Sequence, residues 1–566
     1  MFQLKIIFQI YGTMESSKQL QFHRQSDFKR GIDAEDARRR RDDKQFSIRK
    51  EKREQKLSKK RHAGYHTATT TGNNTSNTGL TALEACINED GEVEHELFKL
   101  LQEEIVNEEL DIKENVKKIH SESYDDVIEA TIFFRILLSR PENPPIQKVI
   151  ASGIIPRLIF LSTVTSHPNL QYEALWVLTN IASGTEEDTQ KIVDANGIAV
   201  FTKLLNEKEA KVRDQAVWVL GNIAGDSYEN KIKIMNEPNA IDLVVKNIEF
   251  APTVSMTQNA IWLASNLIRE KPYPPYNVTS VKIVPVLAKI LNYPRQQLTN
   301  EIITEIFWVL SFLTDESEDS INLIFKYDIV DKIIDILQHN DDINIQFPAI
   351  RTLGNIVANT DDQTRMLIDK GILDILPKLF ISQSQVVRKE ALWTLSNILI
   401  GSKKQVEMVV MFKNHLLISA SIEALHNDYN EMKVKKEAAY VILHLLTNDA
   451  KMNAPVLLKF NAATVVCKLL ESTETDTEST KVVLKILNYL LSENVNTREI
   501  IEDVGCLDKI ESLQTHTDDT IYELATEIVD KYFSESDELF STNAGYTSNS
   551  YNSDAFKTNF GSQWNF

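Results

Sequence analysis

The chain has 566 residues, of which 42% are hydrophobic, with only 17 Gly and 15 Pro. This length exceeds one core of roughly 100–200 residues, so a multidomain or repeat architecture is expected and a single compact enzyme fold is disfavoured. The hydrophobic content excludes bulk disorder, and the scarcity of turn formers favours helices. Three widely separated cysteines, Cys86, Cys467 and Cys506, suggest no disulfide framework and indicate a reducing compartment.

Charge is distributed unevenly along the chain, whose formal net charge is −19. Residues 22–62 hold 16 Lys and Arg against 8 Asp and Glu, which leaves 46 basic and 73 acidic residues for the rest. A basic arm is therefore attached to an acidic body. Such a body repels phosphates and attracts basic ligands, whereas the arm is expected to serve a partner, with nucleic acid as the open alternative.

The first segment, residues 1–21, has an apolar stretch that Gln3, Gln9 and Tyr11 interrupt, and no small-residue cleavage site follows. We interpret it as an extension ahead of a start at Met14 rather than as a secretory signal. No run of about 18 apolar residues occurs, so a soluble protein that does not insert into a membrane is expected. After the arm, residues 63–82 have the Thr, Asn, Ser and Gly composition of a flexible linker, and residues 534–566 form a polar and acidic tail.

Between linker and tail, residues 83–533 repeat a helical pattern. The segments 174–185 (ALWVLTNIASGT), 216–227 (AVWVLGNIAGDS) and 391–402 (ALWTLSNILIGS) are typical copies. Their aromatic position falls at residues separated by 42, 44, 46, 43, 42 and 47 along the chain: Trp176, Trp218, Trp262, Trp308, Arg351, Trp393 and Tyr440. This period predicts an all-α armadillo or HEAT solenoid with three helices per repeat and about ten repeats, the irregular end copies acting as caps.

Four copies carry an asparagine four residues after the tryptophan, which places both on one helix face. The pairs are Trp176/Asn180, Trp218/Asn222, Trp262/Asn266 and Trp393/Asn397. A single Trp at helical spacing is more often core, but an Asn repeated beside it lowers helix propensity and would need a buried partner. A row of such amides suits the N–H and C=O groups of an extended peptide, and the indoles suit aliphatic stems that end in a cation.

Carboxylates accompany these positions. Asp226 lies four residues beyond Asn222, and Glu305, Glu390 and Glu437 each lie three residues before an aromatic position. Singly, each is more often a solvated surface charge, but together they are placed to receive Lys or Arg heads. A scaffold for acidic or phosphorylated ligands is the runner-up and would need a basic groove. An enzyme is disfavoured because no GxxxxGK[ST], HExxH or GxSxG motif occurs and the eleven His show no metal-ligand spacing; neither cofactor nor metal is expected.

These residues resemble the importin-α family, the armadillo adaptors of nuclear import, from about Arg24 to Phe566. The most specific segments are 178–197 (LTNIASGTEEDTQKIVDANG), 215–226 (QAVWVLGNIAGD), 354–364 (GNIVANTDDQT), 389–397 (KEALWTLSN) and 506–516 (CLDKIESLQTH). The resemblance implies a right-handed superhelical solenoid that binds Lys/Arg-rich nuclear localisation signals. It also implies that the protein shuttles between cytoplasm and nucleus, with importin-β as partner and a karyopherin-β-class export receptor with Ran-GTP for its return.

Site residues follow from the resemblance position by position. It implies a major signal-binding site of Trp176, Asn180, Gly184, Thr189, Gln215, Trp218, Asn222, Asp226, Trp262 and Asn266. It implies a minor site of Arg351, Asn355, Glu390, Trp393, Asn397, Glu437 and Tyr440, of which Arg351 and Asn355 lie toward the major site; Glu305 and Trp308 lie between the sites. The arm resembles the importin-β-binding domain through Arg24, Lys29, Arg38, Arg39, Arg40, Arg41, Arg49, Lys50, Lys59, Lys60 and Arg61.

Two features refine this expectation. Lys59, Lys60 and Arg61 themselves look like a signal, so the arm should occupy the groove when importin-β does not hold it. Tyr440 and His444 stand where the family carries Trp and Asn, and Asn359 replaces a glycine. Because Tyr offers less ring area and His cannot present the amide's donor and acceptor together, a weakened minor site is expected.

Overall fold

The computed structural model of the chain describes residues 108–534, apart from 141–143, 270–273, 276, 295–296, 316, 473–475 and 495. The predicted basic arm and linker, and the predicted polar tail after Ser534, lie outside the described residues. Within them every regular element is helical and no strand occurs. The all-α fold predicted from the helical periodicity is therefore confirmed.

The chain divides into two compact units, which we call the N-terminal unit (described residues 108–313) and the C-terminal unit (314–534). The N-terminal unit contains α5 (Glu108–Ile119), α6 (Tyr124–Leu138), α7 (Ile146–Ala151), α8 (Ile155–Leu161), α9 (Pro168–Ile181), α10 (Glu186–Asp194), α11 (Gly197–Leu204), α12 (Ala210–Asp226), α13 (Tyr228–Asn236), α14 (Ala240–Glu249), α15 (Val254–Ile268), α16 (Ser280–Leu291) and α17 (Asn300–Leu313).

The C-terminal unit contains α18 (Glu318–Lys326), α19 (Ile329–His339), α20 (Ile343–Val357), α21 (Asp361–Asp369), α22 (Ile372–Phe380), α23 (Gln385–Ile398), α24 (Lys403–Met411), α25 (Leu416–His426), α26 (Met432–Lys459), α27 (Ala462–Ser472), α28 (Thr477–Glu493), α29 (Asn496–Asp503), α30 (Cys506–Ser512), the 3₁₀ turn η1 (Leu513–Thr515) and α31 (Asp519–Tyr532). Non-helical backbone at Asp449 divides α26, which thus supplies the last helix of one repeat and the first helix of the next.

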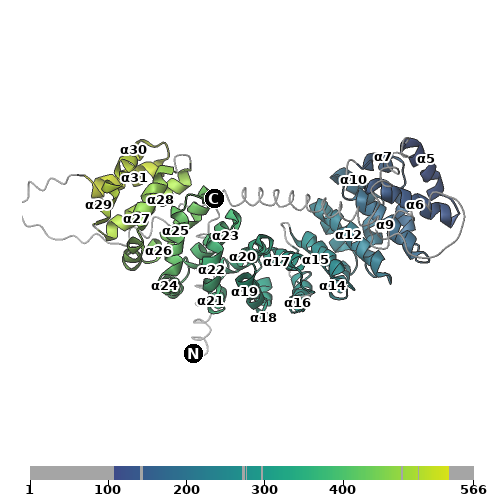
Figure 1. Ribbon diagram of the computed structural model, residues 1–566, viewed down its shortest axis with the longest axis horizontal. Coiled ribbons are helices and arrows are strands. Elements are labelled where there is room, and N and C mark those ends of the chain that lie inside the picture. Colours follow the sequence, from purple (N-terminus) through teal and green to yellow (C-terminus); the bar gives the residue numbers. More distant parts are fainter. Residues whose placement is uncertain are drawn as a thin grey trace, which may run out of the picture. The chain divides into compact units, whose positions relative to one another are not determined.

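Successive repeats pack through their third and longest helices. In the N-terminal unit α6, α9, α12, α15 and α17 pack in that order, and in the C-terminal unit α20, α23, α26, α28 and α31 do the same (Figure 1). Among the described helices this arrangement makes five repeats in each unit, which confirms the armadillo architecture. Apolar side chains in the core between the helices, such as Phe134 of α6, Phe201 of α11 and Phe307 of α17, are fully buried.

The turn between the first and second helix of a repeat has a recurring backbone conformation. The residue before the second helix adopts a positive φ, which Asn and Gly tolerate better than other residues. The turn residues are Asn196, Asn239, Asp328, Gly371, His415, Asn461 and Gly505. One left-handed residue at this place reverses the chain into the next helix in six of these turns, and in the turn before α25 Lys413 and Asn414 also have positive φ.

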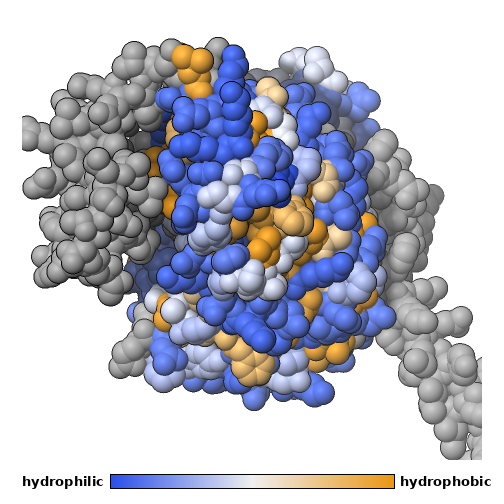
Figure 2. Space-filling view, turned by 90° about the vertical axis from the view of Figure 1, so that its right-hand side faces the viewer, coloured by the Kyte–Doolittle hydropathy of each residue, from blue (hydrophilic) through white to orange (hydrophobic). Residues whose placement is uncertain are grey.

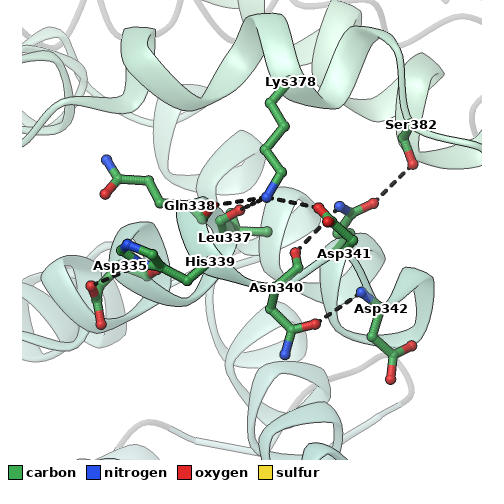
Figure 3. Close-up of polar contacts among 10 residues, drawn as sticks. Asp335, Leu337, Gln338, His339, Asn340, Asp341, Asp342, Lys378 and Ser382 are labelled. Carbon is green, nitrogen blue, oxygen red and sulfur yellow. Dashed lines mark hydrogen bonds and ion pairs between the residues drawn. The ribbon is translucent and has the colours of Figure 1, made fainter.

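Polar contacts between repeats satisfy helix ends. Figure 3 shows Lys378 of α22, whose Nζ donates to the carbonyls of Leu337 and Gln338 at 3.1 and 2.9 Å and pairs with Asp341 at 2.8 Å. Those carbonyls belong to the last turn of α19, which has no intrahelical donors for them. A cation at a helix C-terminus also interacts favourably with the helix dipole.

Figure 2 shows one face of the molecule that is mostly hydrophilic, with apolar residues scattered among the hydrophilic ones. No single helix in the described part of the chain is long and apolar enough to cross a membrane; only the bent pair α24 and α25, at 77°, passes the same test jointly.

Candidate functional site

The third helices carry the tryptophans and asparagines predicted to form a peptide-binding face. In the N-terminal unit Trp176 lies on α9, Trp218 on α12, Trp262 on α15 and Trp308 on α17. The rings of Trp218 and Trp262 approach to 6.0 Å between centroids with a tilt of 48°. Tryptophans about 42 residues apart in sequence therefore become neighbours, as the repeat period predicts.

In the N-terminal unit, each asparagine that lies four residues after a tryptophan donates a hydrogen bond to the preceding repeat. Asn180 Nδ2 donates to Ser139 Oγ at 3.1 Å. Asn222 Nδ2 donates to the Thr179 carbonyl at 3.1 Å, and Asn266 Nδ2 donates to the Gly221 carbonyl at 2.9 Å. The Oδ1 atoms of Asn180 and Asn222 accept no hydrogen bond from any described residue. The donor half of each amide is thus used within the protein, and the acceptor atoms of Asn180 and Asn222 are buried.

In the C-terminal unit the pattern varies by repeat. Asn355 Nδ2 donates to Thr314 Oγ1 at 3.3 Å, whereas neither amide atom of Asn397 has a hydrogen-bond partner among the described residues. His444 places Nδ1 2.8 Å from the Ser396 carbonyl, where the Asn222 amide meets Thr179 in the other unit. His444 therefore occupies the contact between repeats that the asparagine Nδ2 makes elsewhere, and the weaker minor site expected from Tyr440 and His444 stays a prediction.

A small residue just before the asparagine makes room for the next tryptophan. A Cβ added to Gly221 would lie 2.1 Å from Trp262 Cζ3, and one added to Gly354 would lie 2.4 Å from Trp393 Cζ3. The six-membered ring of each indole therefore rests on the backbone of the preceding third helix. The same position is Ser or Thr in other repeats and becomes Leu443 in α26.

Gly221→Ala should consequently lower the melting temperature and move Trp262. Overpacking a tight contact costs about 1–3 kcal/mol, which exceeds the roughly 0.5–1 kcal/mol that Ala gains over Gly within a helix. Gly225→Ala is the matched control, because its Cβ would meet only Asn266 Nδ2 at 3.3 Å. Thermal unfolding followed by tryptophan fluorescence checks this expectation, and an unaltered melting temperature for Gly221→Ala would contradict the packing.

The region predicted to hold a signal lysine lies where α9 passes into α10. Thr189 is fully buried, and its Oγ1 donates to the Thr185 carbonyl at 3.2 Å. Gly184 lies so close to Asp188 that an added Cβ would meet Asp188 Oδ2 at 2.4 Å. Asp226 ends α12, which packs against α10, and Gln215 of α12 donates to Thr179 Oγ1 at 2.7 Å.

Asp188 was not among the predicted site residues. Its carboxylate accepts the Thr185 backbone N–H at 3.0 Å in a capping box and also receives the Gln147 side-chain amide. The capping-box pattern, Thr185 followed three residues later by Asp188, was visible in the sequence as a helix start. The buried carboxylate therefore serves the α10 N-terminus, and Gly184 is required for its close approach.

Glu390, which was predicted to receive ligand cations, is paired within the protein. Its side chain is 1% exposed, and Oε2 pairs with Arg351 Nη1 at 3.0 Å. The guanidinium of Arg351 in turn lies 5.4 Å from the centroid of the Trp393 ring. The carboxylate thus has an arginine of the protein itself as a partner, which sequence position alone did not show, and its role toward a ligand stays a prediction.

A second cluster of the same composition was missed in the N-terminal unit. Arg135 of α6 occupies the aromatic position of the irregular first copy, its guanidinium lies 5.2 Å from the Trp176 ring, and its Nε lies 2.5 Å from Glu173 Oε2. Burial raises the pKa of the Glu173 carboxyl, although the arginine opposes this shift. Glu173 lies three residues before Trp176, as Glu390 does before Trp393, so the spacing that singled out Glu390 would also have found it.

At the far end of the predicted minor site, Tyr440 is tied to the next repeat. Its hydroxyl donates to Glu478 Oε1 at 3.0 Å, and its ring lies 5.7 Å from that of His444. Burial, followed by the nearby Glu478 carboxylate, raises the pKa of the Tyr440 hydroxyl, so it stays protonated and can donate at neutral pH. The tyrosine thus keeps an aromatic face and adds a contact that tryptophan lacks.

No group of three or more His, Cys, Asp or Glu that could hold a metal ion occurs in the described ranges. The arm residues between Arg24 and Arg61 lie outside them. In the N-terminal unit the predicted site residues are indoles, amides oriented by hydrogen bonds to the preceding repeat, and carboxylates.

Comparison with known families matches residues 24–132 to the importin beta binding domain, residues 142–183, 185–225 and 360–400 to armadillo/beta-catenin-like repeats, and residues 497–545 to an atypical Arm repeat. Importin subunit alpha-1a of Oryza sativa subsp. japonica is 32% identical over 532 residues, which cover 91% of this chain and 93% of that protein. This chain belongs to the importin-α family.

Other relatives agree with this assignment to the importin-α family. Importin subunit alpha-3 of Arabidopsis thaliana is 32% identical over 540 residues, covering 91% of this chain and 92% of that protein. Among solved structures, an engineered protein with 25% identity aligns with a TM-score of 0.65 over 74% of this chain and 98% of its own. The resemblance stated from the sequence is thereby confirmed.

Proposed function

We propose that this importin-α family member, a non-enzymatic nuclear import adaptor, binds Lys/Arg-rich nuclear localisation signals along the third helices of its N-terminal unit. The observation that carries the proposal is the repeated pair of an indole and an asparagine whose Nδ2 bonds to the preceding repeat, with the Oδ1 atoms of Asn180 and Asn222 buried and without a hydrogen bond from any described residue. Such acceptors bind a peptide backbone regardless of its sequence. The indoles then take the stems and cationic heads of Lys and Arg.

Charge selects the ligand class. Outside the arm the chain holds 73 acidic against 46 basic residues. Asp226, together with Gly184 and Thr189, is our proposed pocket for the principal signal lysine, and Glu305 with Trp308 extends the acidic and aromatic surface. An armadillo scaffold for acidic or phosphorylated peptides is the alternative, which a phosphopeptide that bound more tightly than a basic one would favour.

The arm provides the second half of the proposed function. Its match to the importin beta binding domain supports recruitment of importin-β by residues 24–61. We further propose that Lys59, Lys60 and Arg61 occupy the signal-binding face when importin-β is absent. The 20-residue linker 63–82 has a root-mean-square span of roughly 25 Å, so the tethered cluster acts at about millimolar effective concentration.

Family membership also supports a proposal for how the protein is exported from the nucleus and where it is located. We propose that the last repeats contact a karyopherin-β-class export receptor together with Ran-GTP, and that the protein shuttles between cytoplasm and nucleus. These repeats include α28 and α31, which pack against each other.

The proposed minor site, formed by Trp393 and Asn397 together with Glu437 and Tyr440, should be weaker than in its relatives. Tyr440→Trp combined with His444→Asn should raise affinity for a bipartite signal by about 0.5–2 kcal/mol through indole contact and amide bonding. The asparagine would keep the contact with the Ser396 carbonyl that His444 now makes. Affinity for a monopartite signal should not change.

Calorimetry with both peptide classes checks this expectation. Tyr440→Phe is the matched control, because it removes only the hydroxyl bond to Glu478 and should leave bipartite binding as it is. Equal gains for both peptides, or none for either, would mean that this part of α26 does not line the signal-binding face.

A further inference from the structure

We propose that Arg135 is a specificity-determining residue: as an internal ligand it fills the cation-binding slot on Trp176 and thereby ends the signal-binding tract at that repeat. The inference rests on the proposed function, since it concerns the tract that binds basic signals. The ligand class excluded from this slot is an additional arginine side chain of a signal.

The geometry around Arg135 is that of a bound ligand arginine. Its guanidinium carbon lies 5.2 Å from the centroid of the Trp176 ring, and its Nε lies 2.5 Å from Glu173 Oε2. Tyr172 meets the same indole edge-on, with centroids 5.4 Å apart. A signal arginine would make the same two kinds of contact, one with an aromatic face and one with a carboxylate. Arg135 itself is only 5% exposed, so it leaves no room for a second guanidinium.

The same arrangement recurs in the other unit. Arg351 lies 5.4 Å from the Trp393 ring and 3.0 Å from Glu390. In both cases the arginine stands at the aromatic position of one repeat, and the glutamate stands three residues before the tryptophan of the next. The register is the same in both units, so the arginine closes the side of the tryptophan that faces the preceding repeat and leaves the side that faces the following repeat to the proposed signal-binding sites.

Repeats inside the proposed major site differ at both positions. At Trp218, the aromatic position of the preceding repeat is Trp176 and not an arginine. The residue three positions before Trp218 is the neutral Gln215. Gln215 is bound to Thr179 Oγ1 at 2.7 Å. The sequence therefore supplies neither member of the internal ion pair there. Signal cations are taken where the pair is missing and are excluded where Arg135 and Glu173 supply it.

Peptide binding to the full chain tests the proposal. Arg135→Ala should bind a Lys-Lys-Lys-Arg-Lys peptide carrying one extra arginine about tenfold more tightly than the same peptide with alanine at that place. The extra arginine is placed two residues before the cluster in one peptide and two residues after it in another, so that either direction of the bound peptide is tested. One of the two peptides should bind Arg135→Ala more tightly. The unaltered chain should not distinguish arginine from alanine. Arg157→Ala is the matched control, because it removes an arginine that lies over Phe160 on α8 and not on a third helix.

A second measurement separates this inference from the proposed function. Methylguanidinium at millimolar concentration should raise the melting temperature of Arg135→Ala relative to methylammonium, and it should not do so for Arg135→Ala combined with Glu173→Gln. If methylguanidinium has no such effect, or if neither extra arginine improves peptide binding while the parent peptide still binds, the slot assignment is wrong and the proposed function stands. If no basic peptide binds either protein, the proposed function fails, and the methylguanidinium result still decides what occupies the slot. Arg135→Gln serves the same comparisons if the alanine variant does not fold.

Discussion

Removal of residues 1–62 should abolish importin-β binding and at the same time strengthen binding of signal peptides. The segment carries the 16 basic residues between positions 22 and 62 that match the importin beta binding domain. An internal cluster at about millimolar effective concentration outcompetes free peptide, so an internal affinity of about 10–100 μM implies a gain of roughly tenfold to a hundredfold when it is removed. Pull-down of importin-β and fluorescence anisotropy of a labelled signal measure the two effects.

A smaller change separates the two roles of the arm. Substituting Lys59, Lys60 and Arg61 together by alanine should release the signal-binding face while Arg38–Arg41 still recruit importin-β. If the arm instead serves to bind nucleic acid, a different result is expected. The arm would bind DNA tightly, and its deletion would leave signal-peptide affinity unaltered. That pair of results would overturn the autoinhibition proposal.

Asp226→Lys should reduce monopartite signal binding by tenfold or more. The substitution removes a charge-assisted hydrogen bond worth about 1.5–3 kcal/mol and places a cation where the ammonium of the signal lysine would lie. About 1.4 kcal/mol corresponds to a tenfold change in affinity. The measurement is anisotropy with a Lys-Lys-Lys-Arg-Lys peptide and the chain lacking residues 1–62, so that the arm does not compete.

The control for this substitution is Asp242→Lys, which makes the same change in net charge on α14. Asp242 is exposed and pairs with Lys282 at 2.7 Å, away from the third helices. Salt at physiological strength screens its distant effect, since the Debye length is about 8 Å. A similar loss of affinity for both variants would show that overall charge, and not a pocket at Asp226, governs binding.

The repeat period made much of the fold predictable. Segments with Trp and Asn four residues apart became the third helices, because a helix places i and i+4 on one face and stacking aligns those faces. The repeat region was expected to end at residue 533, and the last helix, α31, ends at Tyr532. Local spacing determines these features, so one sequence suffices to predict them.

Contacts between repeats were not predictable in the same way. Spacing placed Glu390 beside the tryptophan positions but did not reveal that Arg351, 39 residues earlier, would neutralise it. It also did not reveal that Asn222 would use its donor on Thr179, because that bond depends on the offset of one helix against the next. Periodicity thus indicates which face a residue shares, and packing decides which of its atoms remain for a ligand.

The most direct test of signal recognition is a double-mutant cycle between the protein and a signal peptide. Asp226→Ala would be combined in turn with alanine at each basic residue of a Lys-Lys-Lys-Arg-Lys peptide, with affinities from calorimetry on the chain lacking residues 1–62. We predict that one lysine couples to Asp226 by about 1.5–3 kcal/mol and that the other positions are nearly additive. Additivity at every position would contradict the account, because no signal lysine would then reach the carboxylate.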